Sequence, residues 1–303
     1  MHEIGCAGTV RLLEGPMHDI AVPLIDTNAL LLQSETGGGA LGGALVIGAA
    51  LAAIAALIHW RLWSIPATPR GRIPVEVPLW MLGALVSYAA GAFGAAISLT
   101  DDAAYARLAS NVLGNSAQVL AAGIFFARFT RPSERPASPP FRAALAGVVA
   151  FLLITPIVAS LSIALNALLV SLGQPRTPDA AHQTLAILAE RRDPTLTALT
   201  LAHVALLVPI AEEFIWRGMV QPGIRSALGA WPGIAITTVL FTLIHWGALA
   251  PEGRVVGLSM LVALALGLGI LRERTGSVIA PIVVHALFNA LNVALTLLKS
   301  PAP

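Results

Sequence analysis

Charged side chains are scarce in this sequence: Asp, Glu, Lys and Arg make up 11% of its 303 residues, whereas 56% are hydrophobic. A soluble domain usually has about 25% charged residues. The net charge of +2 is small, and no basic run is interleaved with aromatic residues, so nothing favours nucleic acid as a partner. The composition predicts instead a membrane protein in contact with the lipid bilayer.

Cysteine is nearly absent as well. Cys6 is the only one in the chain, which excludes an internal disulfide and a metal cluster held by thiolates. No Gly-x-Ser-x-Gly motif is present to expose a nucleophilic serine. A cleavable signal peptide is not expected either, because acidic residues and prolines precede the first long apolar run.

Long apolar runs are abundant. A membrane-spanning helix needs about 20 mostly apolar residues. Eight stretches are candidates: 41–60, 78–99, 109–129, 142–172, 196–218, 233–250, 255–271 and 277–298. We therefore predict an all-α, polytopic transmembrane helix bundle with about eight spans, in which Pro156 kinks or tilts the fourth.

Three regions are expected along the chain. Residues 1–40 end in a glycine-rich run and are predicted to be a tail outside the membrane. Residues 41–140 hold three spans, and residues 141–303 hold the other five. Arginine is enriched in the connections at 61–72 and 128–142, which predicts that these loops are cytoplasmic and that both termini are external.

Two adjacent carboxylates, Glu212 and Glu213, interrupt the fifth apolar stretch. An ionisable side chain inside a span is a functional hypothesis by default. Glu213 and Arg217 are four residues apart, so they can form an ion pair on one helix face. Glu212 points about 100° away from Glu213 and remains available for chemistry.

Further polar side chains lie in the later spans. His245 ends an otherwise apolar run, and His285 and Asn289 share one helix face, one turn apart. At about 1.5 Å per residue from the predicted span ends, these three side chains reach the depth of Glu212, near the middle of a hydrocarbon core about 30 Å thick. The shared depth predicts that the four residues form one site.

These residue types predict hydrolysis. A carboxylate and an imidazole that face one cavity can orient and deprotonate a water molecule. A second imidazole and an amide are hydrogen-bond donors suited to stabilising an oxyanion as a carbonyl is attacked. Because no serine or cysteine is placed as a nucleophile, we expect direct attack of water on an amide, without a covalent intermediate.

Three ordered motifs carry a family resemblance: Glu-Glu-x3-Arg at 212–217, Phe-x3-His at 241–245 and His-x3-Asn at 285–289. Together they resemble the CAAX protease and bacteriocin-processing family, also called the Abi family. Its members are intramembrane proteases and include the CAAX prenyl endopeptidases. The resemblance gives Glu213 and Arg217 a supporting role in the first motif.

Carried over by position, the resemblance implies that Glu212 and His245 activate the water and that His285 and Asn289 form the oxyanion site. It extends over roughly residues 145–298 and marks the five-span region as the protease core. It also implies a metal-free mechanism without a cofactor and a peptide or membrane-anchored protein as substrate. The expected location is the plasma (inner) membrane of a bacterium, as a multi-pass protein.

Other interpretations remain open. Zinc accepts Glu and His ligands with an open water position, so a zinc enzyme that uses Glu212, His245 and His285 is a less favoured variant. A non-catalytic membrane factor, such as an immunity protein or a scaffold, is an alternative of a different class. A secondary transporter would require paired broken helices in two related halves, which the sequence does not show.

Two further polar features are expected to lie outside the site. His203 precedes Glu212 by nine residues, which is about 180° around a regular helix, so we expect it to pack or hydrogen-bond elsewhere. Asn111, Asn115 and Gln118 form a separate polar stripe that either joins neighbouring helices or lines a substrate groove.

Overall fold

The computed structural model describes residues 38–62, 64–65, 76–97, 102–129, 138–175, 177 and 193–299. The elements assigned along these ranges are all helices. Most of the predicted N-terminal tail, including Cys6, lies outside the described residues. The all-α fold expected from the apolar runs is confirmed.

Seven long helices and one composite helix form the bundle. The long helices are α2 (Gly38–His59), α3 (Glu76–Ala95), α4 (Ala103–Phe129), α5 (Pro140–Ser171), α10 (Ala230–Ile244), α11 (Arg254–Thr275) and α12 (Ile279–Lys299). The composite helix consists of α7 (Pro194–Ala202), the π-helical turn η2 (His203–Leu207), α8 (Val208–Ile215), the π-helical turn η3 (Trp216–Val220) and α9 (Gln221–Leu228). A short 3-10 turn, η4 (Pro251–Gly253), precedes α11.

Each predicted span overlaps one of these eight helices. The third helix begins six residues before its predicted start, and the C-terminal ends of the fifth and sixth differ from the prediction by six residues or more. The fifth span was expected to end at residue 218, whereas the composite helix continues to Leu228. It ends there because Gly229 adopts a φ of 95°, a conformation that favours glycine. The sixth was expected to reach residue 250, whereas α10 ends at Ile244 and the chain continues in turns.

Five helical segments are long and apolar enough to cross a membrane: Gly42–His59, Pro140–Ser171, Pro194–Leu228, Pro251–Thr275 and Ile279–Leu298. Two shorter apolar segments, Met81–Ala95 and Ala230–Ile244, lie among them. Many large apolar side chains point outward, as expected for a surface that faces lipid; Leu45 and Phe93, for example, are 65% and 76% exposed. The chain is an integral membrane protein.

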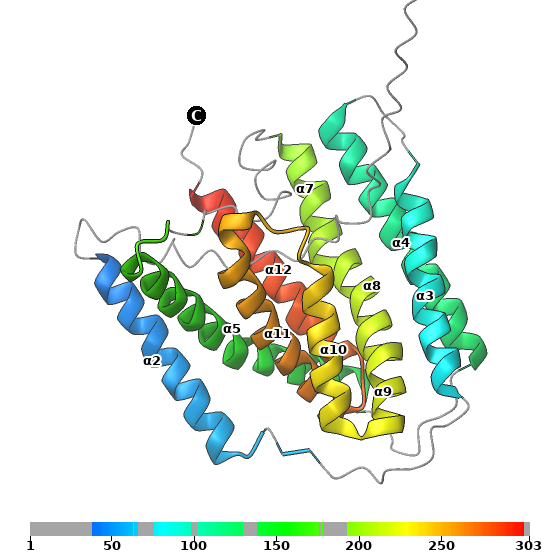
Figure 1. Cartoon of the computed structure of the whole chain (residues 1–303), viewed down its shortest axis with the longest axis horizontal. Coiled ribbons are helices and arrows are strands. Elements are labelled where there is room, and N and C mark those ends of the chain that lie inside the picture. Colours follow the sequence, from blue (N-terminus) through cyan, green and yellow to red (C-terminus); the bar gives the residue numbers. More distant parts are fainter. Residues whose placement is uncertain are drawn as a thin grey trace, which may run out of the picture.

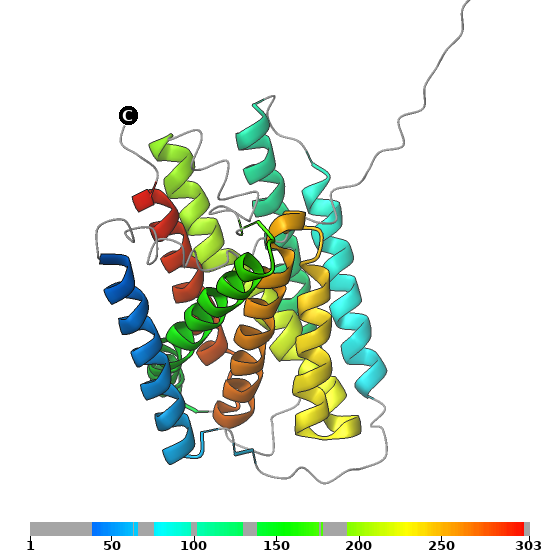
Figure 2. The ribbon, with the colours of Figure 1, turned by 60° about the vertical axis from the view of Figure 1, so that its left-hand side comes forward.

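The composite helix lies between the pair α3 and α4 on one side and α10, α11 and α12 on the other (Figures 1 and 2). At one edge α2 packs on α5, and α5 packs on α11 and α12. At the other edge α3 and α4 form a closely packed pair beside α8, η3 and α9. The helices α10 and α11 pack against each other, and α10 also packs on α9. Side chains from α8, α10 and α12 therefore meet inside the bundle.

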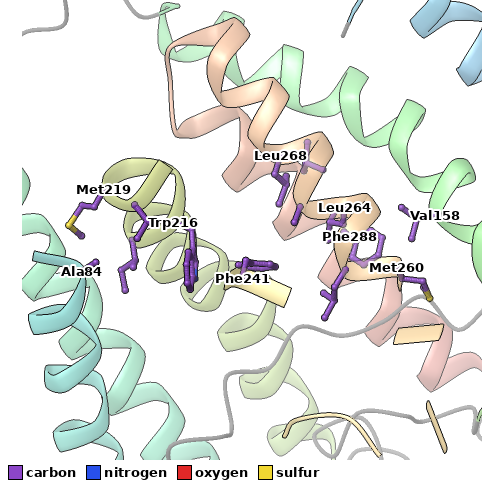
Figure 3. Close-up of a cluster of buried hydrophobic side chains, with 14 of the residues drawn as sticks. Ala84, Val158, Trp216, Met219, Phe241, Met260, Leu264, Leu268 and Phe288 are labelled. Atoms are coloured by element: carbon purple, nitrogen blue, oxygen red, sulfur yellow. The ribbon is translucent and has the colours of Figure 1, made fainter. Parts of the chain in front are cut away.

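An apolar cluster fixes these elements relative to one another (Figure 3). Trp216 of η3 packs edge-on against Phe241 of α10, with ring centroids 5.8 Å apart. Leu264 of α11 and Phe288 of α12 extend the same buried cluster. Because protein interiors are closely packed, such a cluster holds neighbouring polar side chains in defined positions.

Candidate active site

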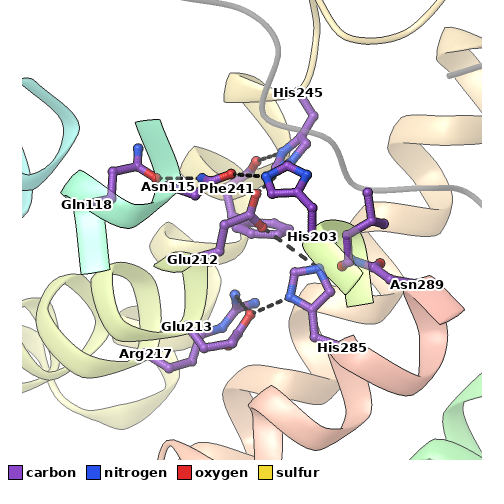
Figure 4. Close-up of polar contacts among 11 residues, drawn as sticks. Asn115, Gln118, His203, Glu212, Glu213, Arg217, Phe241, His245, His285 and Asn289 are labelled. Atoms are coloured by element: carbon purple, nitrogen blue, oxygen red, sulfur yellow. Dashed lines mark hydrogen bonds and ion pairs between the residues drawn. The ribbon is translucent and has the colours of Figure 1, made fainter. Parts of the chain in front are cut away.

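Glu212 lies close to the middle of the composite helix, which extends from Pro194 to Leu228. Its two carboxylate oxygens face two histidines on different helices. One oxygen is 3.8 Å from Nε2 of His245, at the end of α10, and the other is 3.8 Å from Nε2 of His285, on α12. Figure 4 shows the carboxylate between the two imidazoles. The structure thus brings these three predicted residues together.

His245 is oriented by its own helix end. Its Nδ1 lies 2.6 Å from the carbonyl oxygen of Phe241, one turn earlier. A carbonyl oxygen only accepts hydrogen bonds, so this contact places a proton on Nδ1, and in the neutral ring Nε2 is then an acceptor. The Phe241 ring packs on the imidazole at 4.7 Å between centroids. The free nitrogen of His245 is therefore directed at Glu212.

His285 is oriented by the second carboxylate. Its Nδ1 lies 2.9 Å from Oε1 of Glu213, and the same oxygen accepts a 2.9 Å hydrogen bond from Arg217. The ion pair between Glu213 and Arg217 was predicted from their spacing, and both side chains are fully buried. The Arg217 guanidinium also lies 4.6 Å from the Phe241 ring centroid. Glu213 therefore links the first motif to His285.

Several polar atoms around Glu212 lack a partner within the described part of the chain. They are both oxygens of Glu212, Nε2 of His245, Nε2 of His285 and Oδ1 of Asn289. A buried polar atom without a hydrogen bond costs about 1–3 kcal/mol, so such a concentration is unusual in a structural core. It is typical of a site that binds a polar molecule.

Asn289 is placed beside this centre by a hydrogen bond to the composite helix. Its Nδ2 donates to the carbonyl of Val204 at 2.9 Å. In the π-helical turn η2 the N–H of Val208 bonds to His203 instead of Val204. The next residue, Pro209, has no N–H to offer. The Val204 carbonyl is thereby left for Asn289, which anchors α12 to the composite helix.

The same arrangement, a π-helical turn followed by a proline, occurs thirteen residues later. In η3 the N–H of Gln221 bonds to Trp216, and Pro222 follows without an N–H. The carbonyl of Arg217 accepts instead a 2.9 Å hydrogen bond from Nε of Arg272 on α11. Each π-helical turn thus frees one carbonyl, five residues before a proline, for a side chain of a neighbouring helix. π-Helical turns are frequent at functional sites.

His203 and the polar stripe of α4 form a separate contact. Nε2 of His203 lies 2.8 Å from Oδ1 of Asn115, whose Nδ2 donates to Gln118. The prediction that His203 hydrogen-bonds elsewhere is confirmed. The angular argument for it was wrong, because η2 adds a residue to one turn, and His203 is then about 80° rather than 180° from Glu212. At least part of the stripe joins helices.

No group of three His, Cys, Asp or Glu side chains among the described residues is arranged to hold a metal ion. The site contains two carboxylates and one permanent cation, Arg217. Two anchoring groups, the Val204 carbonyl and Arg272, were missed in the sequence. The signal available for them was a proline five residues after each freed carbonyl.

The fold and this site define a polytopic membrane protein with a buried carboxylate–imidazole centre. Residues 194–291 match the family model described as Rce1-like: type II CAAX prenyl endopeptidase Rce1-like. An Rce1-like domain of the CAAX protease and bacteriocin-processing family is therefore present in this segment, about a third of the chain. The segment contains all three motifs but is shorter than the predicted 145–298. Neither the curated proteins nor the solved structures compared with the chain include a match.

Proposed function

We propose that this protein is an intramembrane endopeptidase in which Glu212 and His245 activate a water molecule for attack on a peptide bond. The observation that carries the proposal is that the two Glu212 oxygens each lie 3.8 Å from an imidazole Nε2, one of His245 and one of His285. None of these four atoms has a hydrogen-bond partner in the described residues. The Glu212 carboxylate and Nε2 of His245 are facing acceptors, and a water molecule between them has two protons to give. Such a water is held and polarised for general-base catalysis.

His285 and Asn289 are proposed to stabilise the oxyanion. His285 can donate from Nε2 while Nδ1 stays bonded to Glu213 only if its ring carries a second proton. Asn289 uses one amide hydrogen for Val204 and keeps another for the oxyanion. Each donor is worth about 10²- to 10³-fold in kcat.

The substrate proposed is a peptide or a membrane-anchored protein, because the centre is buried within a bundle that carries the family's protease domain. The family model's description names a prenyl endopeptidase, and a prenylated C-terminal segment is one member of this substrate class. We further propose that residues 141–303 form the protease core, with 41–140 as an N-terminal three-span region. The proposed location is the inner membrane of a bacterium.

The substrate can be found by comparing the peptide termini of membrane fractions from cells with the wild-type protein and with Glu212→Ala. We expect at least one precursor to accumulate uncleaved in the variant. Identical termini in both membranes would contradict proteolysis. Full biological complementation by Glu212→Ala would favour the non-catalytic immunity or scaffold function instead.

Removal of metal separates the water-activating mechanism from its zinc variant. We expect exhaustive chelation of the purified protein to leave cleavage unchanged within about twofold, because base and oxyanion donors are all side chains of this chain. Metal analysis of the protein before and after chelation provides the control. Activity that is lost on chelation and restored by zinc would make Glu212, His245 and His285 ligands.

A further inference from the structure

Tyr88 lies on α3, far in the sequence from the segment that matches the family model. Its ring is partly buried, and its hydroxyl oxygen is fully enclosed. Nε1 of Trp216 can donate to this oxygen, but the hydroxyl proton has no acceptor within the described residues. A buried phenol usually finds one, because an unpaired hydroxyl in an apolar region is costly.

Aromatic contacts connect Tyr88 to the site. The Tyr88 and Trp216 rings are 6.0 Å apart with an edge-to-face orientation, and Trp216 packs in the same way on Phe241. Phe241 in turn contacts His245. Trp216 follows Glu212 by four residues, so the two side chains leave the composite helix on nearly the same face. Tyr88 therefore approaches the site along the face that carries Glu212.

The charged groups of the site lie near the Tyr88 hydroxyl. The hydroxyl lies within electrostatic range of Glu212, Arg217 and Glu213. The phenol hydroxyl is a hydrogen-bond donor, and both oxygens of Glu212 are acceptors without a partner in the described residues. No direct hydrogen bond joins Tyr88 to Glu212 in the described structure, and a water molecule can link the two by accepting from the phenol and donating to the carboxylate.

We propose that Tyr88 is a positioning residue of this site, whose hydroxyl donates a hydrogen bond through a bound water to the Glu212 carboxylate. This inference rests on the proposed function. The bond fixes the direction in which Glu212 presents its oxygens to the attacking water. It also makes α3, from the N-terminal region, one wall of the catalytic centre.

The competing interpretation is that Tyr88 only fills space between α3 and η3. Its ring belongs to the side chains that pack on the central apolar cluster. Phenylalanine would satisfy that role, because it retains the contact with Trp216 and loses only the hydroxyl. A substitution by phenylalanine therefore separates hydrogen bonding from packing.

The chain has only two tyrosines, which gives a matched control. The hydroxyl of Tyr105 donates to Asp193 at 2.8 Å, in a contact that involves none of the site residues. We expect Tyr88→Phe to lower kcat by about tenfold, the factor for one hydrogen bond near a charged group, with KM within about twofold. Tyr105→Phe is expected to leave both constants unchanged. A Tyr88→Phe kcat within twofold of wild type would overturn the proposal.

A second readout does not depend on activity. Incorporation of 3-fluorotyrosine gives two ¹⁹F resonances, and the one lost in Tyr88→Phe belongs to Tyr88. We expect Glu212→Gln to shift the Tyr88 resonance and leave that of Tyr105 in place; an unmoved Tyr88 resonance would overturn the contact. If Glu212→Gln retains full proteolysis while the resonance shifts, the contact stands and the proposed role of Glu212 as base is wrong.

Discussion

Replacement of Glu212 by glutamine is expected to lower kcat/KM for the cleaved precursor by about 10²- to 10⁴-fold, the usual contribution of a general base. Glutamine keeps the shape of the side chain and can still hydrogen-bond, but it cannot accept the proton of the attacking water. The folded structure should tolerate the change, because neither oxygen of Glu212 has a hydrogen-bond partner in the described residues. Initial rates with purified protein in liposomes measure the effect.

Two control variants show whether the loss is specific to Glu212. Glu252→Gln makes the same chemical change at an exposed position of η4 and is expected to be silent. Glu213→Gln keeps an oxygen acceptor for His285 but replaces the charged partner of its Nδ1 by a neutral amide, so an intermediate loss is expected. A greater loss for Glu213→Gln than for Glu212→Gln would exchange the roles assigned to the two carboxylates.

Replacement of Arg217 by methionine is expected to produce the largest loss of stability. The guanidinium is fully buried, pairs with Glu213 at 2.9 Å, and donates to the Ala265 carbonyl at 3.3 Å. Removal of one partner from a buried ion pair costs about 3–5 kcal/mol, because the remaining charge stays uncompensated. We expect Tm to fall by about 10 °C in a thermal melt of the detergent-solubilised protein.

The double variant Glu213→Gln with Arg217→Met tests this reason. It removes both charges and leaves no unpaired carboxylate, so it should be more stable than Arg217→Met alone. If the double variant is less stable by the sum of the single effects, the guanidinium contributes through packing on Phe241 rather than through charge.

Much of this architecture follows from local rules that the sequence expresses directly. Apolar runs of sufficient length specify helices, and each of the eight predicted stretches overlaps one. The Glu213–Arg217 pair was predictable because residues four apart share a helix face. The proximity of Glu212, His245 and His285 was predictable because span length converts sequence position into depth.

The features of the site that the sequence did not predict depend on departures from regular helix geometry. A π-helical turn forms where the contacts that it permits offset the strain energy of the turn. Sequence periodicity does not report the energy of those contacts. The turn η2 changes the direction of His203 and frees the Val204 carbonyl for Asn289, and η3 frees the Arg217 carbonyl for Arg272. Tyr88 approaches Trp216 through the packing of α3 on η3, a long-range contact that no local pattern encodes.

The central claim is that Glu212 and His245 act together on one water molecule. It is tested most directly by kcat for Glu212→Gln, His245→Asn and the variant that carries both changes, with folding checked by the thermal melt. Residues that act as a unit show strongly non-additive losses, so the double variant should be no slower than the slower single variant, within about threefold. Losses that multiply in the double variant would show that the two residues act on separate steps and would contradict the mechanism.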